Sequence, residues 1–65
     1  MKITDFQIID TMRSHGGGFA SALAVAAMRA DHDNLARIKR AFPEYWTNYR
    51  LLAERIASKL AREDA

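Results

Sequence analysis

Three consecutive glycines, Gly16 to Gly18, and a single proline, Pro43, divide an otherwise helix-forming sequence into short segments. Consecutive glycines are poor helix formers and tolerate positive φ, so they end a helix, whereas proline suits the first turn of a new one. The β-branched residues are few and never alternate with polar ones, so no strand is expected. The predicted fold class is all-α: one domain, residues 1–65, folded as a small bundle of three or four helices. Helical spacing is found at about residues 4–14, 19–30, 31–42 and 44–62.

The first two segments owe their helical character to different features. Thr4 and Gln7 match a capping box at the start of the first segment. Alanine dominates the second segment, where it favours helix and leaves a thin surface that lets a neighbouring helix approach closely. The residues expected to point inward are Phe6, Ile8, Ile9 and Met12 in the first segment. In the second they are the row Phe19, Leu23, Ala26 and Ala30, with Ala22 and Ala27 beside it. Those expected to face water in the first segment are Asp5, Asp10 and Arg13.

The third and fourth segments meet at the proline. Asp31 suits an N-cap with Asn34 at the third helical position. Phe42 precedes Pro43, which pushes it out of the helical region, so a break is expected there. In the third segment Leu35, Ile38 and Phe42 are expected inward, and Arg37, Lys39 and Arg40 outward. The fourth should be a long amphipathic helix that frays near Asp64, with an apolar stripe of Tyr45, Tyr49, Leu52, Ile56 and Leu60.

A chain of 65 residues needs support that a larger domain would not. Such a chain buries only about 60% of the surface that its unfolded form exposes. It has no cysteine, so disulfides are excluded, and two histidines, His15 and His32, are too few for a structural zinc site. Association of copies is the remaining support, and we expect a homo-oligomer. The apolar stretch 16–28 is too short to span a bilayer, and no signal peptide pattern is present, which predicts a cytoplasmic protein without a membrane partner.

The glycine stretch permits two functional interpretations besides a helix connection. His15 to Gly18 matches the oxyanion loop of some lipases, but the Gly-x-Ser-x-Gly nucleophile motif and the sheet that supports it are missing, so no enzyme and no catalytic residue are predicted. Free backbone N–H groups at a helix start can instead hold an anion. Neither the phosphate-loop pattern nor the dinucleotide pattern occurs. The candidate ligand-binding residues for an anionic nucleotide are Arg13, His15, Gly16, Gly17 and Gly18.

The charged residues support no metal site and only weakly support nucleic acid binding. Asp31, His32 and Asp33 are adjacent at a helix start, point in different directions and are explained by capping, so no metal and no cofactor are predicted. The formal charge is +2, and the basic residues are spread along the chain. The second and third segments resemble a helix-turn-helix in outline, but its reading helix would begin with two aspartates, which makes nucleic acid an unlikely partner.

The aromatic residues between positions 42 and 49 predict an interface. Four large rings fall within eight residues, and Trp46 lies about 100° around the helix from Tyr45. A bundle this small can hardly bury both directions, and Trp and Tyr dominate binding anchors. The alternative is that all four rings cap the core. The candidate protein-interface residues are Phe42, Tyr45, Trp46, Tyr49, Leu52 and Ile56.

From Gly16 to Tyr49 the chain resembles short uncharacterised proteins encoded by tailed phages and prophages. The resemblance is carried by Gly16-Gly17 with Phe19, Leu23-Ala24, Ala30-Asp31, Asn34, Arg37-Ile38-Lys39, Ala41 to Trp46, and Tyr49. It transfers no activity, but it implies a small accessory protein in the cytoplasm of a bacterial host. We therefore expect a self-associating, non-enzymatic helical module that recognises a host protein through its aromatic segment and last helix and antagonises host defence. Two alternatives remain: an oligomeric sponge for an anionic nucleotide signal, and a helix-turn-helix-like DNA binder.

Overall fold

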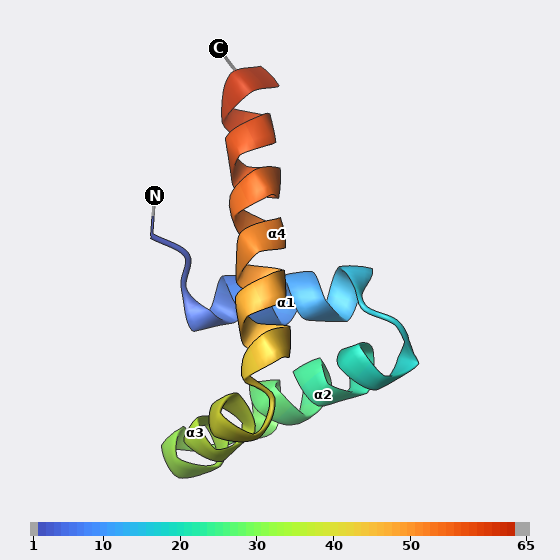
Figure 1. Cartoon of the computed structure of the whole chain (residues 1–65), viewed down its shortest axis with the longest axis vertical. Coiled ribbons are helices and arrows are strands. Elements are labelled where there is room, and N and C mark those ends of the chain that lie inside the picture. Colours follow the sequence, from blue (N-terminus) through green and yellow to red (C-terminus); the bar gives the residue numbers. More distant parts are fainter. Residues whose placement is uncertain (1, 64–65) are drawn as a thin grey trace.

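Four α-helices with short connections account for nearly all of the chain, and the computed structural model describes residues 2–63 (Figure 1). The helices are α1 (Asp5–His15), α2 (Gly18–Arg29), α3 (His32–Ala41) and α4 (Pro43–Glu63). Residues 2–63 contain no strand, so the all-α prediction is confirmed, and each helix bound lies within one residue of the expected position. The expected fraying near Asp64 lies outside the described residues.

The helix ends form through the local contacts that the sequence predicted. The Gln7 backbone N–H donates to Thr4 Oγ1 at 3.2 Å, and the Thr4 N–H donates to Gln7 Oε1 at 2.8 Å, which completes the capping box. At α3, the Asn34 N–H donates to Asp31 Oδ1 at 2.8 Å. Phe42 leaves the helical region with φ −129° and ψ 58°, and α4 begins at the next residue and continues unbroken to Glu63.

The four helices form the predicted small bundle, in which α4 crosses the other helices. Figure 1 shows α1 and α2 running back and forth as a hairpin, and α4 crossing α1 steeply before its C-terminal half projects beyond the other helices. The molecule measures 39 × 23 × 19 Å, and its radius of gyration is 12.2 Å. A compact domain of this length is expected to have a radius of gyration of about 10.8 Å. The projecting half of α4 therefore lengthens the molecule. Of the helices within residues 2–63, none combines the length and apolar character needed to cross a bilayer.

The core forms where α1, α2 and α4 meet. Its buried residues are Ile8, Ile9, Met12, Ala20, Ala24, Ala27 and Trp46. Small alanines let α2 lie close to α1, so that Met12 is fully enclosed. From α3, Leu35 and Ile38 pack on this core only half-buried.

Of the residues expected inward, Ile8, Ile9 and Met12 are buried and Leu23 packs half-buried on the core, but Phe6 and Phe19 were placed wrongly. In α1 the buried face centres on Ile8 and Met12, so Phe6, which lies about 160° around the helix from Ile8, is 71% exposed. In α2 the buried row is Ala20, Ala24 and Ala27, one residue on from the expected row of Phe19, Leu23, Ala26 and Ala30. Close approach of α1 requires the alanine side of α2, which turns Phe19 outward to 57% exposure.

Candidate functional site

Four rings from three parts of the chain come together on one side of the molecule. Phe19 at the start of α2 contacts Phe42 edge to face at 5.6 Å between ring centroids and lies 5.6 Å from Tyr45. Phe42 meets Tyr45 at 6.0 Å, and the rings of Tyr45 and Tyr49 are parallel at 6.4 Å. We call these four residues the aromatic face. Sequence reasoning found three of them and assigned Phe19 to the core. The sequence did offer one indication that Phe19 is exposed: it follows the glycines directly and lies at the very start of α2.

Trp46 belongs to the core, and its expected role as an exposed interface anchor was wrong. Its side chain is only 8% exposed, and its indole Nε1 donates to Asp5 Oδ1 at 3.1 Å. A buried indole N–H needs such an acceptor. The alternative, that the aromatic segment caps the core, describes Trp46 better, because the indole belongs to the buried cluster and is bonded to the first turn of α1.

Asp5 links three helices, although it and Lys39 were both expected to face water. Lys39 Nζ on α3 donates to both carboxylate oxygens of Asp5, at 3.3 and 3.1 Å, and lies 5.8 Å from the Trp46 ring centroid. We call Asp5, Lys39 and Trp46 the Asp5 joint. Desolvation raises the pKa of Asp5, but the hydrogen bonds from Trp46 and Lys39 and the nearby ammonium outweigh it, so the pKa is lowered.

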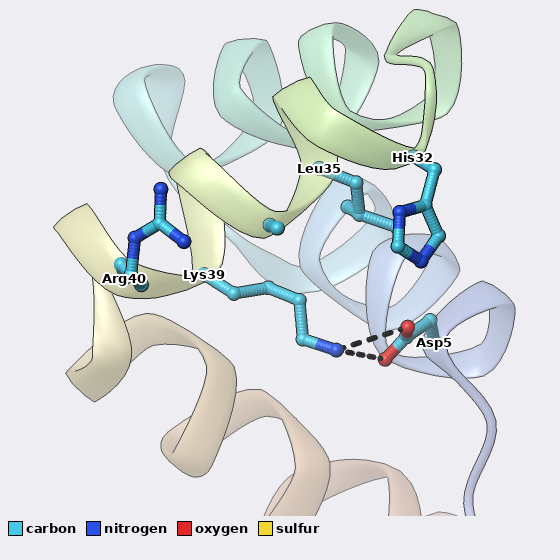
Figure 2. A pocket seen from close by; sticks show the side chains of 6 residues that line it. Asp5, His32, Leu35, Lys39 and Arg40 are labelled. Carbon is cyan, nitrogen blue, oxygen red and sulfur yellow. Dashed lines mark hydrogen bonds and ion pairs between the residues drawn. The ribbon is translucent and has the colours of Figure 1, made fainter.

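The open pocket beside this joint is lined by α3 and by Asp5 of α1. It has a volume of about 250 Å³ and lies between α1 and α3. Figure 2 shows Lys39 extending across the pocket to Asp5, while Arg40 lies apart from the pair. The Lys39 ammonium is already matched by the carboxylate, and His32 stands almost wholly in solvent. The Lys39–Asp5 ion pair beside this pocket therefore links α3 to α1.

The glycine stretch connects α1 to α2 by close approach rather than by positive φ, which no described glycine adopts. A Cβ on Gly16 would lie 2.5 Å from the Met12 carbonyl oxygen and 2.6 Å from Ala20 Cβ, so only glycine fits there. Tyr49 Oη lies 3.1 Å from the same point, which places the connection beside the aromatic face. Gly17 and Gly18 border open space.

The cationic groups proposed for an anion site are only partly available. Arg13 and His15 lie in the last turn of α1, and both are exposed. The Arg13 guanidinium pairs with Asp10 at 3.7 Å, which reduces the charge that it offers to a ligand. The N-cap of α2, Gly17, has no side chain to bond the first N–H groups, so those groups face outward from the helix start.

The remaining predicted residues do not join a common site. Leu52 and Ile56 are half-buried on α4 beyond the aromatic face, and Ile56 lines a shallow groove with α1. His32 and Asp33 are exposed, with 3.8 Å between His32 Nδ1 and Asp33 Oδ1, and Asp31 caps α3. Within residues 2–63, no three His, Cys, Asp or Glu side chains converge as a metal site would require.

The comparisons add no family to this geometry. No protein-family model, no curated protein and no solved structure matches the chain. The resemblance to phage proteins therefore rests on the quoted residues alone, and the aromatic face is the feature on which a function can be argued.

Proposed function

We propose that this chain is a non-enzymatic binding module that recognises a protein partner through the aromatic face. The observation that carries the proposal is the exposure of Phe19, which is 57% accessible although its ring contacts both Phe42 and Tyr45. Exposed apolar residues that occur singly need no explanation, but a contiguous group of rings is typical of an interaction site. The phage resemblance adds the expectation that the partner is a host protein and that binding antagonises host defence.

The contacts among the rings favour strong binding for a small area. Each ring of the aromatic face is held by at least one other, so little side-chain freedom is lost when a partner covers them. Tyr45 and Tyr49 carry hydroxyl groups that can stay hydrated at the rim, while Phe19 and Phe42 supply apolar area. Aromatic anchors of this kind account for most of the energy of many protein interfaces.

The surroundings of the rings favour a partner segment that is apolar and positively charged. Glu44 and Asn48 line a shallow groove together with Tyr45 and Tyr49. A carboxylate at the rim favours a lysine or arginine on the partner through charge complementarity. A short amphipathic segment with a basic residue beside its apolar side chains meets both requirements.

A photocrosslinking amino acid in place of Phe19 tests the proposal in a bacterial lysate, because it can bond only to a protein in contact with the aromatic face. The captured protein is then purified and titrated with unmodified chain, Phe19→Asp and Met28→Asp. Met28 is a matched control: it is 46% exposed and lies nine residues along α2, which places it on the opposite side of the helix.

We expect Phe19→Asp to weaken binding at least about ten-fold, equivalent to about 1.4 kcal/mol, and Met28→Asp to leave it unchanged. Equal affinities for the unmodified chain and Phe19→Asp would overturn the proposal. So would the absence of any specific crosslinked protein.

The second candidate function is sequestration of an anionic nucleotide. One observation favours it: Gly16 lies against Tyr49, so the uncapped start of α2 and the aromatic rings share one side of the molecule. Phosphate could meet the backbone N–H groups while a base stacks on a ring. Calorimetry with cyclic and ADP-ribose-type nucleotides tests nucleotide binding, and the absence of binding heat with all of them would exclude this function. DNA binding, the third candidate, requires an electrophoretic shift at low salt.

A further inference from the structure

A second apolar surface lies where the projecting half of α4 leaves α1. Phe6 is 71% exposed and Leu60 is 55% exposed, and both line a shallow groove between the two helices with Ile56 and Ala57. We call these four residues the α1–α4 face. In Figure 1 the upper half of α4 stands clear of the other helices, so no other helix of residues 2–63 covers this face.

We propose that a second copy of this chain covers the α1–α4 face, with the projecting halves of α4 packed antiparallel about a two-fold axis. The same surface then serves both copies, as a two-fold contact requires. This pairing uses residues outside the aromatic face, so it can be tested independently of the proposed partner binding.

The surface area supports a second copy as the occupant. A globular monomer of 7.4 kDa is expected to expose about 4,200 Å², whereas this chain exposes 4734 Å². The excess of roughly 500 Å² is of the same order as the 800 Å² that each partner buries in a standard interface. Pairing would therefore return the exposed surface per chain close to the value for a globular protein.

The distribution of charge also favours self-pairing. Lys59 lies at the edge of the α1–α4 face, about 100° around α4 from Leu60, and Asp10 lies at the α1 side of the groove, where Arg13 of the same chain is 3.7 Å away. In an antiparallel arrangement the C-terminal part of α4 from one copy approaches α1 of the other. Lys59 of the second copy thus comes near Asp10, and the reverse contact forms at the same time.

The small side chains of α4 make close pairing possible. Ala53 and Ala57 lie in the groove beside Leu60. Alanine allows two helix backbones to approach closely, and the larger side chains Phe6 and Leu60 can then pack around the contact. Alanines alone would not indicate a partner, but here they lie beside the exposed apolar side chains of Phe6 and Leu60.

The test measures molar mass in solution for the full chain and two leucine variants. Leu60→Glu places a charge on the α1–α4 face. Leu51→Glu is the matched control, because Leu51 is 43% exposed, lies on the same helix, and is nine residues away, on the opposite side. Circular dichroism of both variants checks that they keep their helices, as expected for exposed positions.

We expect the unmodified chain and Leu51→Glu to sediment at twice the 7.4 kDa of one chain. Leu60→Glu should raise the dimer dissociation constant about a hundred-fold or more, because the two-fold axis makes each substitution act twice. A monomeric unmodified chain at high micromolar concentration would overturn the proposal, as would a trimer or larger ring. Equal dissociation constants for the two leucine variants would do the same.

Charge reversal tests the antiparallel arrangement separately. Asp10→Lys should weaken the dimer about ten-fold, and adding Lys59→Glu should restore part of that loss by exchanging the two charges across the interface. If the double variant is no tighter than Asp10→Lys alone, the antiparallel arrangement is wrong. Phe19→Asp should leave the dimer intact, which separates this surface from the aromatic face.

Discussion

Replacing Trp46 by alanine is expected to unfold the chain rather than only to weaken binding. The side chain is 8% exposed and belongs to the core between α1 and α4. A tryptophan buries up to about 250 Å², and at about 25 cal/mol per Å² this burial stabilises the fold by at most roughly 6 kcal/mol. Measured Trp→Ala changes cost about 3–5 kcal/mol.

The lost hydrogen bond to Asp5 adds only a little to this cost. The Asp5 carboxylate is 43% exposed, so water can replace the missing indole donor, and the added cost is about 1 kcal/mol at most. A core from so short a chain supplies only about 3–5 kcal/mol in total. The expected loss therefore equals or exceeds the whole stability.

Urea denaturation followed by circular dichroism measures the effect. Trp46→Ala should lack a cooperative transition, whereas Trp46→Phe keeps a ring in place and should remain folded with a lower midpoint. Leu51→Ala, at an exposed position of the same helix, is the control and should cost less than about 1 kcal/mol. Trp46 is the sole tryptophan, so its fluorescence should be poorly quenched by acrylamide. A Trp46→Ala midpoint equal to that of the unmodified chain would refute the argument.

Three further predictions concern charge, backbone and capping. Because the pKa of Asp5 is lowered from its ordinary value of 3.8, its stabilisation is fully present above that pH and is lost as pH falls through the folded-state pKa. Asp5→Asn should therefore flatten the acid side of a profile of melting temperature against pH. Gly16→Ala forces a Cβ against the Met12 carbonyl and should lower the melting temperature, whereas Gly18→Ala, in open space within α2, should raise stability by about 0.5–1 kcal/mol. Asp31→Ala should cost about 1 kcal/mol in urea denaturation.

The helix bounds could be predicted because local residues determine them. Thr4 and Asp31 cap α1 and α3 through side chains three residues from their backbone partners. Pro43 ends one helix and begins the next through the restriction it places on its own φ and on the preceding residue. Such interactions depend on sequence neighbours only, so they can be recognised before any tertiary contact is known.

The helix faces could not be predicted in the same way, because size and hydrophobicity compete. In α2 the larger residues Phe19 and Leu23 suggested an inward row, but α1 packs on Ala20 and Ala24. Close packing of two helices gains many small contacts and needs thin side chains between them. The same requirement explains Gly16, whose missing Cβ admits the Met12 carbonyl and Ala20. An alanine-rich helix offers two plausible faces, and only the neighbouring helix selects one.

The position of Trp46 depends on a carboxylate 41 residues earlier in the chain. A buried indole N–H must find an acceptor, and the carbonyls within α1 are already engaged in the helix. Asp5 lies in the first turn of α1, where its side chain is free to accept, and Lys39 compensates its charge. The Asp5 joint thus draws Trp46 into the core. The expected interface then loses its tryptophan, and Phe19, turned outward by the packing of α2, takes the exposed place beside Phe42 and Tyr45. The burial of Trp46 therefore depends on Asp5, a polar residue near the N-terminus that is far from it in sequence.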